Sequence, residues 1–460
     1  MTKFSTKEIR RSFIDLILFV FIRSLYTFLV VKNLTGLYYP GSGSYGIDYN
    51  SAKEPLSFLL FIIVSAAFLL LRFNSDFKKN VAYTIFIIYF IPLNASYPIK
   101  NLPTDYLLLS TLFFILLILA LKLFGNSRPL NCAKPDHNYE KKIENYVFWF
   151  CVLVCSFYIV YKFSYNGFSF FFSFESDEVY SYRTAYTDYL ENVSGSLFAY
   201  ATSIVRYLAS FAVCALLYVS LKNRRIFGIV LSLFTVLCIY SVDSGKGTVF
   251  YVIIIFFIYF FWKKGWLQHY TRFFALSILG LLLLSTVEFV AFKRSIVFTY
   301  LIRREMYAPS WLNYLYYDFF SSNPKILWSQ NVFIFQSFLP QHYSVGPLKL
   351  ISDAYFQGVA PSPNTGLFAE AYMQFGVFGI FIYPLIISAI LSFVEKQFYG
   401  VSSGLLIILA LRIAISLTNI PILRTDFILT FVLFAAFLFL YKLFKPAGRA
   451  EVLVFERNRC

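Results

Sequence analysis

The chain contains few histidines, few cysteines and few charged residues for its length of 460 residues. The three histidines, His137, His269 and His342, are scattered along the sequence, which argues against a histidine-ligated metal site. None of the six cysteines forms a CxxC pair, so we expect buried apolar thiols and no disulfide framework. The sequence therefore predicts no metal centre.

Charged residues make up only 14% of the chain, whereas hydrophobic residues make up 59%. A soluble domain of this size has too little interior to bury so much apolar surface. Repeated apolar runs of about 17 to 25 residues instead predict an all-α, polytopic membrane bundle. The net charge of +16 comes with no basic tail and no soluble domain, so we expect no nucleic-acid partner.

Hydropathy predicts about twelve membrane spans, and the first is expected to be retained because it lacks a small-residue cleavage site. The expected spans are residues 12–31, 55–73, 81–94, 105–124, 146–163, 196–220, 226–240, 247–264, 272–292, 366–392, 401–418 and 426–444.

Lysine and arginine alternate between rich and poor segments along the chain, which predicts that both termini lie in the cytoplasm. Within a single membrane domain of residues 1–460, this orientation creates two large outer loops. Residues 164–195 are acidic and tyrosine-rich, and residues 293–365 are basic and aromatic. The two loops are expected either to pack against each other or to share a substrate site.

A basic cluster, Lys293, Arg294, Arg303 and Arg304, lies where the topology predicts few cations. Arginine matches phosphate with a planar fork of donors whose charge does not titrate away. If KRSIVFTYLIRRE is helical, its spacing lets Arg294 and Arg304 converge on one anion. The cluster predicts binding of a lipid-linked anionic substrate, with contact to lipid headgroups as the alternative.

Aromatic side chains crowd the same outer loop, where their faces are suited to stacking on sugar rings. An aromatic belt at the membrane interface is the alternative. Tyr317 is the candidate substrate-binding residue among them. The set comprises Tyr307, Trp311, Tyr314, Tyr316, Tyr317, Phe319, Phe320 and Trp328.

Glu370 lies near the outer end of an expected span, where a carboxylate is costly unless it is paired or faces a wet cavity. A partly desolvated glutamate is suited to act as a general base, and an ion pair with an arginine is the alternative. Asn364 and Tyr372 flank it as candidate substrate-binding residues, and Tyr372 is expected on a different helix face from Glu370.

Four more residues are candidates. Lys246, in SVDSGKG, stands at an expected helix N-terminus, which favours either an anion site or an ordinary turn. Arg206 and Arg412 lie well inside spans, where they either line a substrate cavity or make structural pairs. His342 is the lone histidine expected outside, as a candidate base or an exposed loop residue.

The run IRREMYAPSWLNYLYYDFFSSNPKILWSQN is followed by NTGLFAEAYMQFGVFGI and preceded by SGKG at a span start. In these motifs the chain resembles bacterial oligosaccharide repeat-unit polymerases, the Wzy-type O-antigen and capsule polymerases. The resemblance covers about the second half of the chain by motif and the rest by topology.

The resemblance implies a multi-pass glycosyltransferase of the bacterial inner membrane that joins undecaprenyl-pyrophosphate-linked repeat units at the outer face. It implies no cofactor, and as partners it implies membrane lipids and a chain-length regulator, a flippase and a ligase of the same route. Two other functions stay open: an O-antigen ligase that transfers glycan to lipid A core, and a flippase for lipid-linked oligosaccharides.

Overall fold

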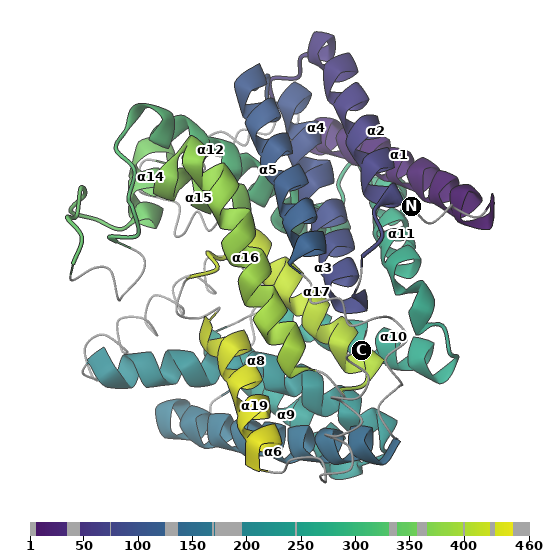
Figure 1. Cartoon of the computed structure of the whole chain (residues 1–460), viewed down its shortest axis with the longest axis vertical. Helices are drawn as coiled ribbons and strands as arrows, with labels where there is room; N and C mark the ends of the chain where they lie inside the picture. The colour runs from purple at the N-terminus through teal and green to yellow at the C-terminus, as the bar shows by residue number, and fades with distance from the viewer. Residues whose placement is uncertain are drawn as a thin grey trace, which may run out of the picture. The chain divides into compact units, whose positions relative to one another are not determined.

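The computed structural model describes residues 6–34, 47–73, 75–124, 137–167, 170, 196–243, 246–330, 338–356, 366–398, 401–423 and 428–444. Within these ranges all regular secondary structure is helical, which confirms the all-α prediction (Figure 1). The helices are α1 (Thr6–Leu34), η1 (Ser51–Lys53), α2 (Glu54–Leu70), α3 (Asp76–Ile85), η2 (Phe86–Phe90), α4 (Ile91–Ile99), α5 (Thr104–Leu123), α6 (His137–Asn166), α8 (Ser196–Lys222), α9 (Ile226–Asp243), α10 (Lys246–Lys263), η3 (Leu267–His269), α11 (Tyr270–Phe292), η4 (Phe298–Tyr307), α12 (Ala308–Ser322), α14 (Pro347–Phe356), α15 (Leu367–Phe375), α16 (Val377–Gln397), α17 (Ser403–Asn419), η5 (Ile428–Val432) and α19 (Leu433–Phe444).

Eight of the described helical stretches are long and apolar enough to cross a membrane. They are Arg10–Leu34, Ser51–Leu70, Asp76–Ile99, Thr104–Leu123, Asn138–Ser164, Ile204–Lys222, Leu267–Phe292 and Val377–Gln397. Shorter apolar helices cover Ile226–Val242, Phe250–Lys263, Ser403–Asn419 and Thr430–Tyr441. Eleven of the twelve expected spans fall on these helices, and the span expected at 366–392 does so only from Val377 on. The number of spans and the N-in, C-in orientation stay predictions.

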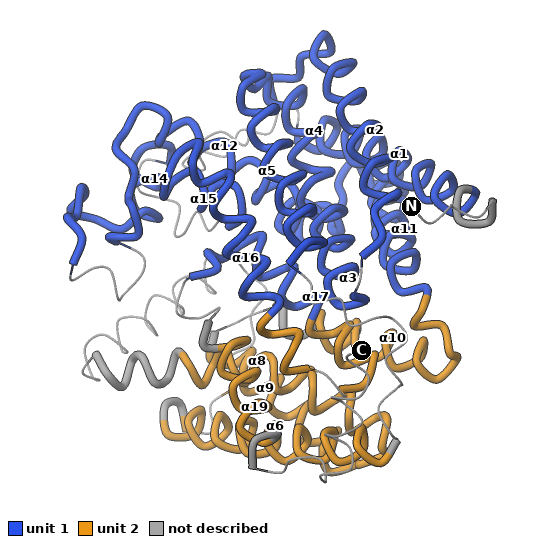
Figure 2. Tube along the Cα trace, in the orientation of Figure 1, with its two compact units in different colours: residues 1–132, 269–392, 410–424 blue, residues 133–268, 393–409, 425–460 orange. Residues whose placement is uncertain are grey.

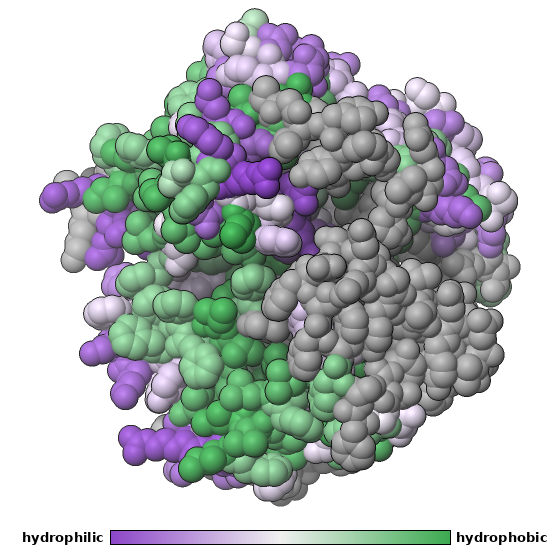
Figure 3. Space-filling model, turned by 180° about the vertical axis from the view of Figure 1, so that it is seen from behind, coloured by the Kyte–Doolittle hydropathy of each residue, from purple (hydrophilic) through white to green (hydrophobic). Residues whose placement is uncertain are grey.

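Large apolar side chains lie exposed on several of the long helices. Phe21 on α1 is 62% exposed, and Val290 on α11 is 64% exposed. Figure 3 shows green apolar residues gathered over a broad part of the described surface. Such surface is unfavourable in water and favourable against lipid chains. Together with the helix lengths, it indicates a membrane protein.

The chain forms two compact units, each built from separate stretches of sequence (Figure 2). The first unit, which is blue in the figure, comprises residues 1–132, 269–392 and 410–424. In it α1 packs on α11, α2 and α4, and α12 packs on α14 and α15. The second unit comprises residues 133–268, 393–409 and 425–460, and in it α8 packs on α6, α9 and α10.

A run of phenylalanine rings forms the centre of the first unit. The rings of Phe68 and Phe86 stack with centroids 4.8 Å apart, and those of Phe90 and Phe114 stack at 4.3 Å. Phe61 adds a stacked contact to Phe90 at 6.4 Å. All five side chains are buried, so α2, the helices at 76–99 and α5 share one apolar core.

Two of the three described π-helical segments, η2 and η4, each precede a proline. At η2 the N–H of Ile91 bonds to the carbonyl of Phe86, five residues back, and Pro92 follows. At η4 the N–H of Ala308 bonds in the same way to Arg303, and Pro309 follows. Because proline lacks an N–H and crowds the preceding turn, the wider π turn accommodates it without ending the helix.

The segment expected as one span at residues 366–392 is divided into two helices. α15 ends at Phe375, Gly376 follows with φ of 59°, and α16 starts at Val377. Gly379 lies so close to α15 that an added Cβ would overlap the carbonyl oxygen of Ala371. A sharp corner therefore separates α15 from the membrane-length helix α16, and the single-span expectation for 366–392 is wrong in its first ten residues.

Residues 293–365, expected as a polar loop, contain three helices where the structure describes them: η4, α12 and α14. On α12 the buried residues include Leu312, Leu315, Tyr316 and Phe320, at the spacing of one helix face. That face packs on α15, so the segment is a folded part of the first unit.

Candidate functional site

Four aromatic rings on α12 and α15 form a continuous line, which we call the aromatic row: Trp311, Tyr314, Tyr317 and Tyr372. Trp311 and Tyr314 stack with centroids 5.4 Å apart, and Tyr314 and Tyr317 follow at 6.4 Å. Tyr317 meets Tyr372 at 4.8 Å. The three rings on α12 are half-buried, so each leaves part of its surface available to a ligand.

The local sequence of α12 explains the row. Trp311, Tyr314 and Tyr317 recur at every third position, which places them along one side of a helix. The apolar residues between them supply the buried side of α12 against α15. The pattern therefore presents aromatic rings on one side of α12, while the other side packs on α15. Figure 1 shows α12 and α15 next to each other.

The short helix α15 is held at its first turn by side chains from other elements. The hydroxyl of Tyr89 in η2 accepts from the N–H of Phe368 at 3.1 Å, and Oδ1 of Asn313 in α12 accepts from the N–H of Ala369 at 3.0 Å. Tyr89 also donates to Asn313 Oδ1 at 2.8 Å. These bonds satisfy N–H groups that a helix start leaves unpaired, and they fix the place of Tyr372.

Glu370 points away from the aromatic row into the interior of the first unit. Its side chain is 1% exposed, and its Oε2 accepts from the backbone N–H of Ile422 at 2.8 Å. α15 is not one of the described helices that are long and apolar enough to cross a membrane. Burial raises the pKa of Glu370 to about 8, although the N–H groups of Ile422 and Leu423 and the Tyr383 hydroxyl act to lower it.

Two lysines lie at the ends of the aromatic row. Lys100 holds its Nζ 3.8 Å from the ring centroid of Trp311, and burial lowers the pKa of Lys100 to about 8. Lys325 holds its Nζ 5.3 Å from the ring of Tyr372 and donates to the carbonyl of Phe320. Burial lowers the pKa of Lys325 as well.

A carboxylate stands beside the row. Asp318 is exposed on α12, accepts from the Tyr314 hydroxyl at 3.3 Å, and accepts from the Tyr355 hydroxyl of α14 at 2.6 Å. Burial, followed by the charge of Asp318 and the bond to it, raises the pKa of Tyr314 to about 12. The pKa of Tyr355 is raised by the same causes. Both phenols therefore stay protonated and act as donors near neutral pH.

The members of the basic cluster have different surroundings. Lys293 ends α11 in a left-handed conformation with φ of 56°, and Arg294 follows it, exposed and before η4 begins. Arg303 is half-buried within η4, and Arg304 is exposed. Because Arg294 precedes the helix, the helical spacing expected to align it with Arg304 does not apply. Their convergence on one anion stays a prediction.

The other sequence candidates fall in several places. His342 is exposed in the segment before α14. Arg412 is half-buried in the first unit and Arg206 in the second, where its guanidinium lies 5.6 Å from the ring of Tyr207. A cavity shared by the two arginines stays a prediction. The side chain of Lys246, residue Asn364 and most of the loop 164–195 lie outside the described residues.

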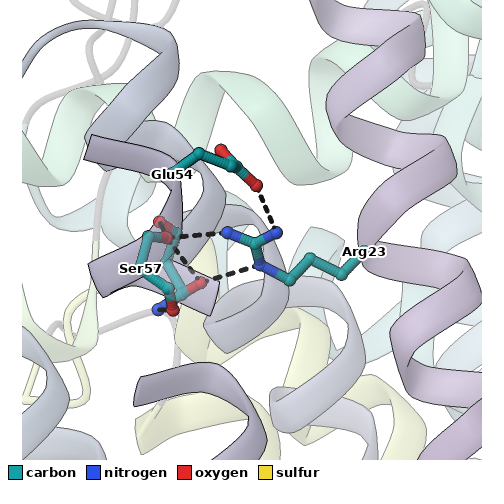
Figure 4. Close-up of polar contacts among 4 residues, drawn as sticks. Arg23, Glu54 and Ser57 are labelled. Carbon is teal, nitrogen blue, oxygen red and sulfur yellow. Dashed lines mark hydrogen bonds and ion pairs between the residues drawn. The ribbon is translucent and has the colours of Figure 1, made fainter. Parts of the chain in front are cut away.

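Charged residues on the membrane-length helices α1 and α11 make ion pairs. Arg23 of α1 is 1% exposed and donates to Glu54 at 2.6 Å, Ser57 at 2.7 Å and Asn94 at 2.9 Å (Figure 4). Arg272 of α11 pairs with Asp15 of α1 at 2.7 Å. The guanidinium of Arg23 thus has a charged partner and two polar ones, as a buried cation requires.

Glu288 of α11 supports the start of the next helix. Its Oε2 accepts from the Ser295 hydroxyl at 2.7 Å and from the N–H of Val297 at 3.0 Å. The carboxylate therefore satisfies a donor at the beginning of the helical turns that lead into η4. Its contacts fix the chain beside Arg294 and give Glu288 a structural role.

Trp311, Tyr314, Tyr317 and Tyr372 are candidates from the sequence alone, whereas Lys100 and Asp318 join the site only in the structure. Asp318 stands within the quoted run YLYYDFF, where a carboxylate among aromatic residues is a usable signal for sugar binding. Lys100 lies more than 200 residues from Trp311 in the sequence, and only the fold brings them together.

No protein-family profile, curated protein or solved structure matches this chain. Its class therefore rests on its own features: described helices of membrane length, apolar residues on their outer faces, and paired charges within them. These features define a helical membrane protein. The aromatic row combines partly exposed rings with a carboxylate and two lysines, and it is the candidate site.

Proposed function

We propose that the protein is a membrane glycosyltransferase that polymerises oligosaccharide repeat units carried on undecaprenyl pyrophosphate. The observation that carries the proposal is the aromatic row, which belongs to the same compact unit as the membrane-length helices α1, α2, α5 and α11. Aromatic faces suit sugar rings, and long apolar helices suit a polyprenyl tail. A substrate that is both a glycan and a lipid needs both surfaces in one protein.

The proposed reaction is a displacement at an anomeric carbon. The acceptor hydroxyl of the incoming repeat unit forms a bond to that carbon, while the bond from the carbon to the lipid pyrophosphate breaks. A base takes the proton of the hydroxyl, and the electron pair leaves with the pyrophosphate. Arg294, Arg303 and Arg304 are proposed to stabilise the charge that develops on this leaving group.

The identity of the base stays a prediction. Glu370 is buried and bonded to the N–H of Ile422. Its use as a base therefore requires the acceptor hydroxyl to reach the buried side of α15. His342 is exposed and accessible from solvent. The proposed base must come within hydrogen-bonding reach of the acceptor hydroxyl, which makes position the first criterion and pKa the second.

The proposal is tested by deleting the gene in its native cell and separating the surface glycan by size. We expect single repeat units at the surface, and complementation should restore the long polymer. Loss of a flippase would leave no repeat unit outside, and loss of a ligase would leave polymer on its lipid carrier. Long surface polymer in the deletion strain would refute the proposed function.

A further inference from the structure

Asp318 differs from the other described charges around the aromatic row because its carboxylate is exposed and yet held in one orientation. Tyr314, four residues earlier on α12, donates to Oδ1, and Tyr355 of α14 donates to Oδ2. Each oxygen is thus fixed by one phenol. An exposed aspartate without such donors rotates freely, and ordering it on binding costs conformational entropy.

The carboxylate retains capacity to accept further hydrogen bonds. An ionised carboxylate offers about four lone-pair sites on its two oxygens. The two phenols use one site on each oxygen, so each oxygen keeps one site. Two neighbouring hydroxyls on a sugar ring present two donors at a spacing that matches the two oxygens of a carboxylate. The orientation of Asp318 therefore suits a vicinal diol.

The ring of Tyr314 lies next to this carboxylate and belongs to the aromatic row. The Tyr314 ring is half-buried and stacks on Trp311, which holds its plane in place. A sugar has polar hydroxyls around its edge and apolar C–H groups on its faces. A fixed carboxylate beside a fixed ring matches these two surfaces at once.

The geometry points to Asp318, Tyr314 and Tyr355 as a subsite that binds one sugar ring through a pair of neighbouring hydroxyls. The inference deepens the proposed function, on which it rests for the identity of the glycan. A tie between α12 and α14 is the purely structural alternative. It predicts that loss of either partner of the Asp318–Tyr355 bond has the same effect.

The experiment measures binding of repeat-unit oligosaccharides, cut from the cell's own surface glycan, to the purified full-length protein in lipid nanodiscs. Four variants are compared: Asp318→Asn, Tyr355→Phe, Asp353→Asn and Tyr317→Ala. Asp353 is an exposed carboxylate on α14 and controls for the change in net charge. Tyr317→Ala removes a ring of the row and leaves the subsite residues in place. Melting temperatures of all variants are recorded alongside.

We expect Asp318→Asn to weaken binding by about tenfold or more, because it removes a charged acceptor. Asp353→Asn should bind as tightly as the unchanged protein. Tyr355→Phe should lose less affinity than Asp318→Asn, because it removes one orienting donor and leaves the charged acceptor in place. Periodate cleaves vicinal diols. Oligosaccharide treated with periodate should therefore no longer compete with untreated oligosaccharide for binding to the protein.

Three results would overturn the subsite. They are equal affinity of Asp318→Asn and Asp353→Asn, an equal loss in Asp318→Asn and Tyr355→Phe, and no saturable binding by the unchanged protein. The proposed function is tested by a separate measurement, the length of the surface polymer in the deletion strain. Suppose that Asp318→Asn binds the oligosaccharide more weakly than Asp353→Asn, while the deletion strain still makes long polymer. This combination would support the sugar subsite and refute the proposed polymerase function.

Discussion

At the scale of single residues, the described polar groups of the first unit fall into two kinds. Arg23 and Glu370 are buried and bonded to protein partners, whereas Arg294 and Arg304 are exposed. A buried group contributes first to holding helices together, and its change is expected to alter stability. An exposed group away from such contacts is free to meet a ligand, and its change is expected to alter function with little loss of stability.

Arg294 and Arg304 belong to the exposed kind. We expect Arg294→Ala and Arg304→Ala each to reduce polymer strongly, because a charge-assisted bond to phosphate is worth about 1.5–3 kcal/mol. Lysine should restore only part of the activity, since it lacks the planar fork. Polymer length on gels gives the measurement, at matched protein levels. Lys349→Ala, at an exposed cation on α14, is the control, and normal polymer in both arginine variants would remove them from the site.

Glu370 gives a prediction about pH. Its pKa rises from 4.5 in the unfolded chain to about 8 in the folded protein. Between these values the folded state holds a proton that the unfolded chain has released, so its stability falls as pH rises through this window. Glu370→Gln is neutral throughout and should lose this slope. Melting temperatures in detergent from pH 5 to pH 9 provide the comparison.

The activity of the same variant separates two roles for Glu370. A catalytic base predicts that Glu370→Gln is stable at neutral pH but makes little polymer. A structural anchor for the N–H of Ile422 predicts a change in protein level or melting temperature with polymer formed in proportion. A variant that matches the unchanged protein in stability, pH slope and polymer would exclude both roles.

At the scale of elements, the corner between α15 and α16 is the feature on which the site depends. The corner lets α15 carry Tyr372 to the aromatic row while α16 runs on as a membrane-length helix. Gly379 makes the close approach of the two helices possible, because any side chain there would meet the carbonyl of Ala371.

We therefore expect Gly379→Ala to destabilise the protein by about 1–3 kcal/mol, since the backbone contact cannot move aside cheaply. Gly280→Ala on α11 is the matched control, because nothing lies within 4 Å of a Cβ added there. The control should leave stability unchanged or raise it slightly. Unfolding in detergent, followed by circular dichroism, compares the two, and equal melting curves would contradict the predicted corner.

The contact between α1, α2 and α4 at Arg23 offers a second test at this scale. Arg23→Met leaves Glu54 without its cation, and we expect a loss of about 3–5 kcal/mol. The double variant Arg23→Met with Glu54→Gln removes both charges and should lose less than the single variant. Melting temperatures of the three proteins give the comparison. A double variant less stable than Arg23→Met would show that the ion pair is not the dominant interaction.

The sequence predicted the elements better than it predicted their breaks and their contacts. Apolar runs located the membrane-length helices, since burial of a long apolar segment depends on composition alone. The break at Gly376 was missed, because glycine within an apolar run is also common in continuous membrane helices. The helix α12 was missed because its aromatic and polar residues resemble a loop, although Pro309 in its first turn was an available signal.

Contacts between residues far apart in the chain could not be predicted from the sequence alone. Tyr355 reaches Asp318 from 37 positions away, and Asn313 reaches α15 across 56 positions. No local pattern fixes such pairs, because they depend on how α12, α14 and α15 pack. Glu370 was expected at the end of a span, yet its partner Ile422 follows α17 and becomes visible only in the fold.

At the scale of the whole molecule, orientation in the membrane decides which face meets the substrate. The cation pattern predicts that α12 and the aromatic row lie outside. A cysteine introduced at Ser322, which is exposed at the end of α12, should react with an impermeant reagent in intact or outer-permeabilised cells. A cysteine at Lys264, exposed after α10, should react only after the inner membrane is opened.

Both labelling variants are made with serine at Cys132 and Cys460, because the four other thiols are buried. Reaction of the Ser322 position only after lysis would reverse the predicted orientation. It would also place the aromatic row on the cytoplasmic side, away from the outer face at which the proposed reaction takes place.

The attachments of α15 also impose an order on biosynthesis. Its first N–H groups meet Tyr89 and Asn313, which the ribosome has already made when α15 emerges. Glu370 cannot form its bond at that stage, because its partner Ile422 is synthesised 52 residues later. Until then the carboxyl group is uncharged or faces water, since a bare charge is costly in an apolar setting. The residues that follow α17 therefore complete the attachment of α15, and a chain released before residue 422 carries Tyr372 on a helix that Glu370 does not yet anchor.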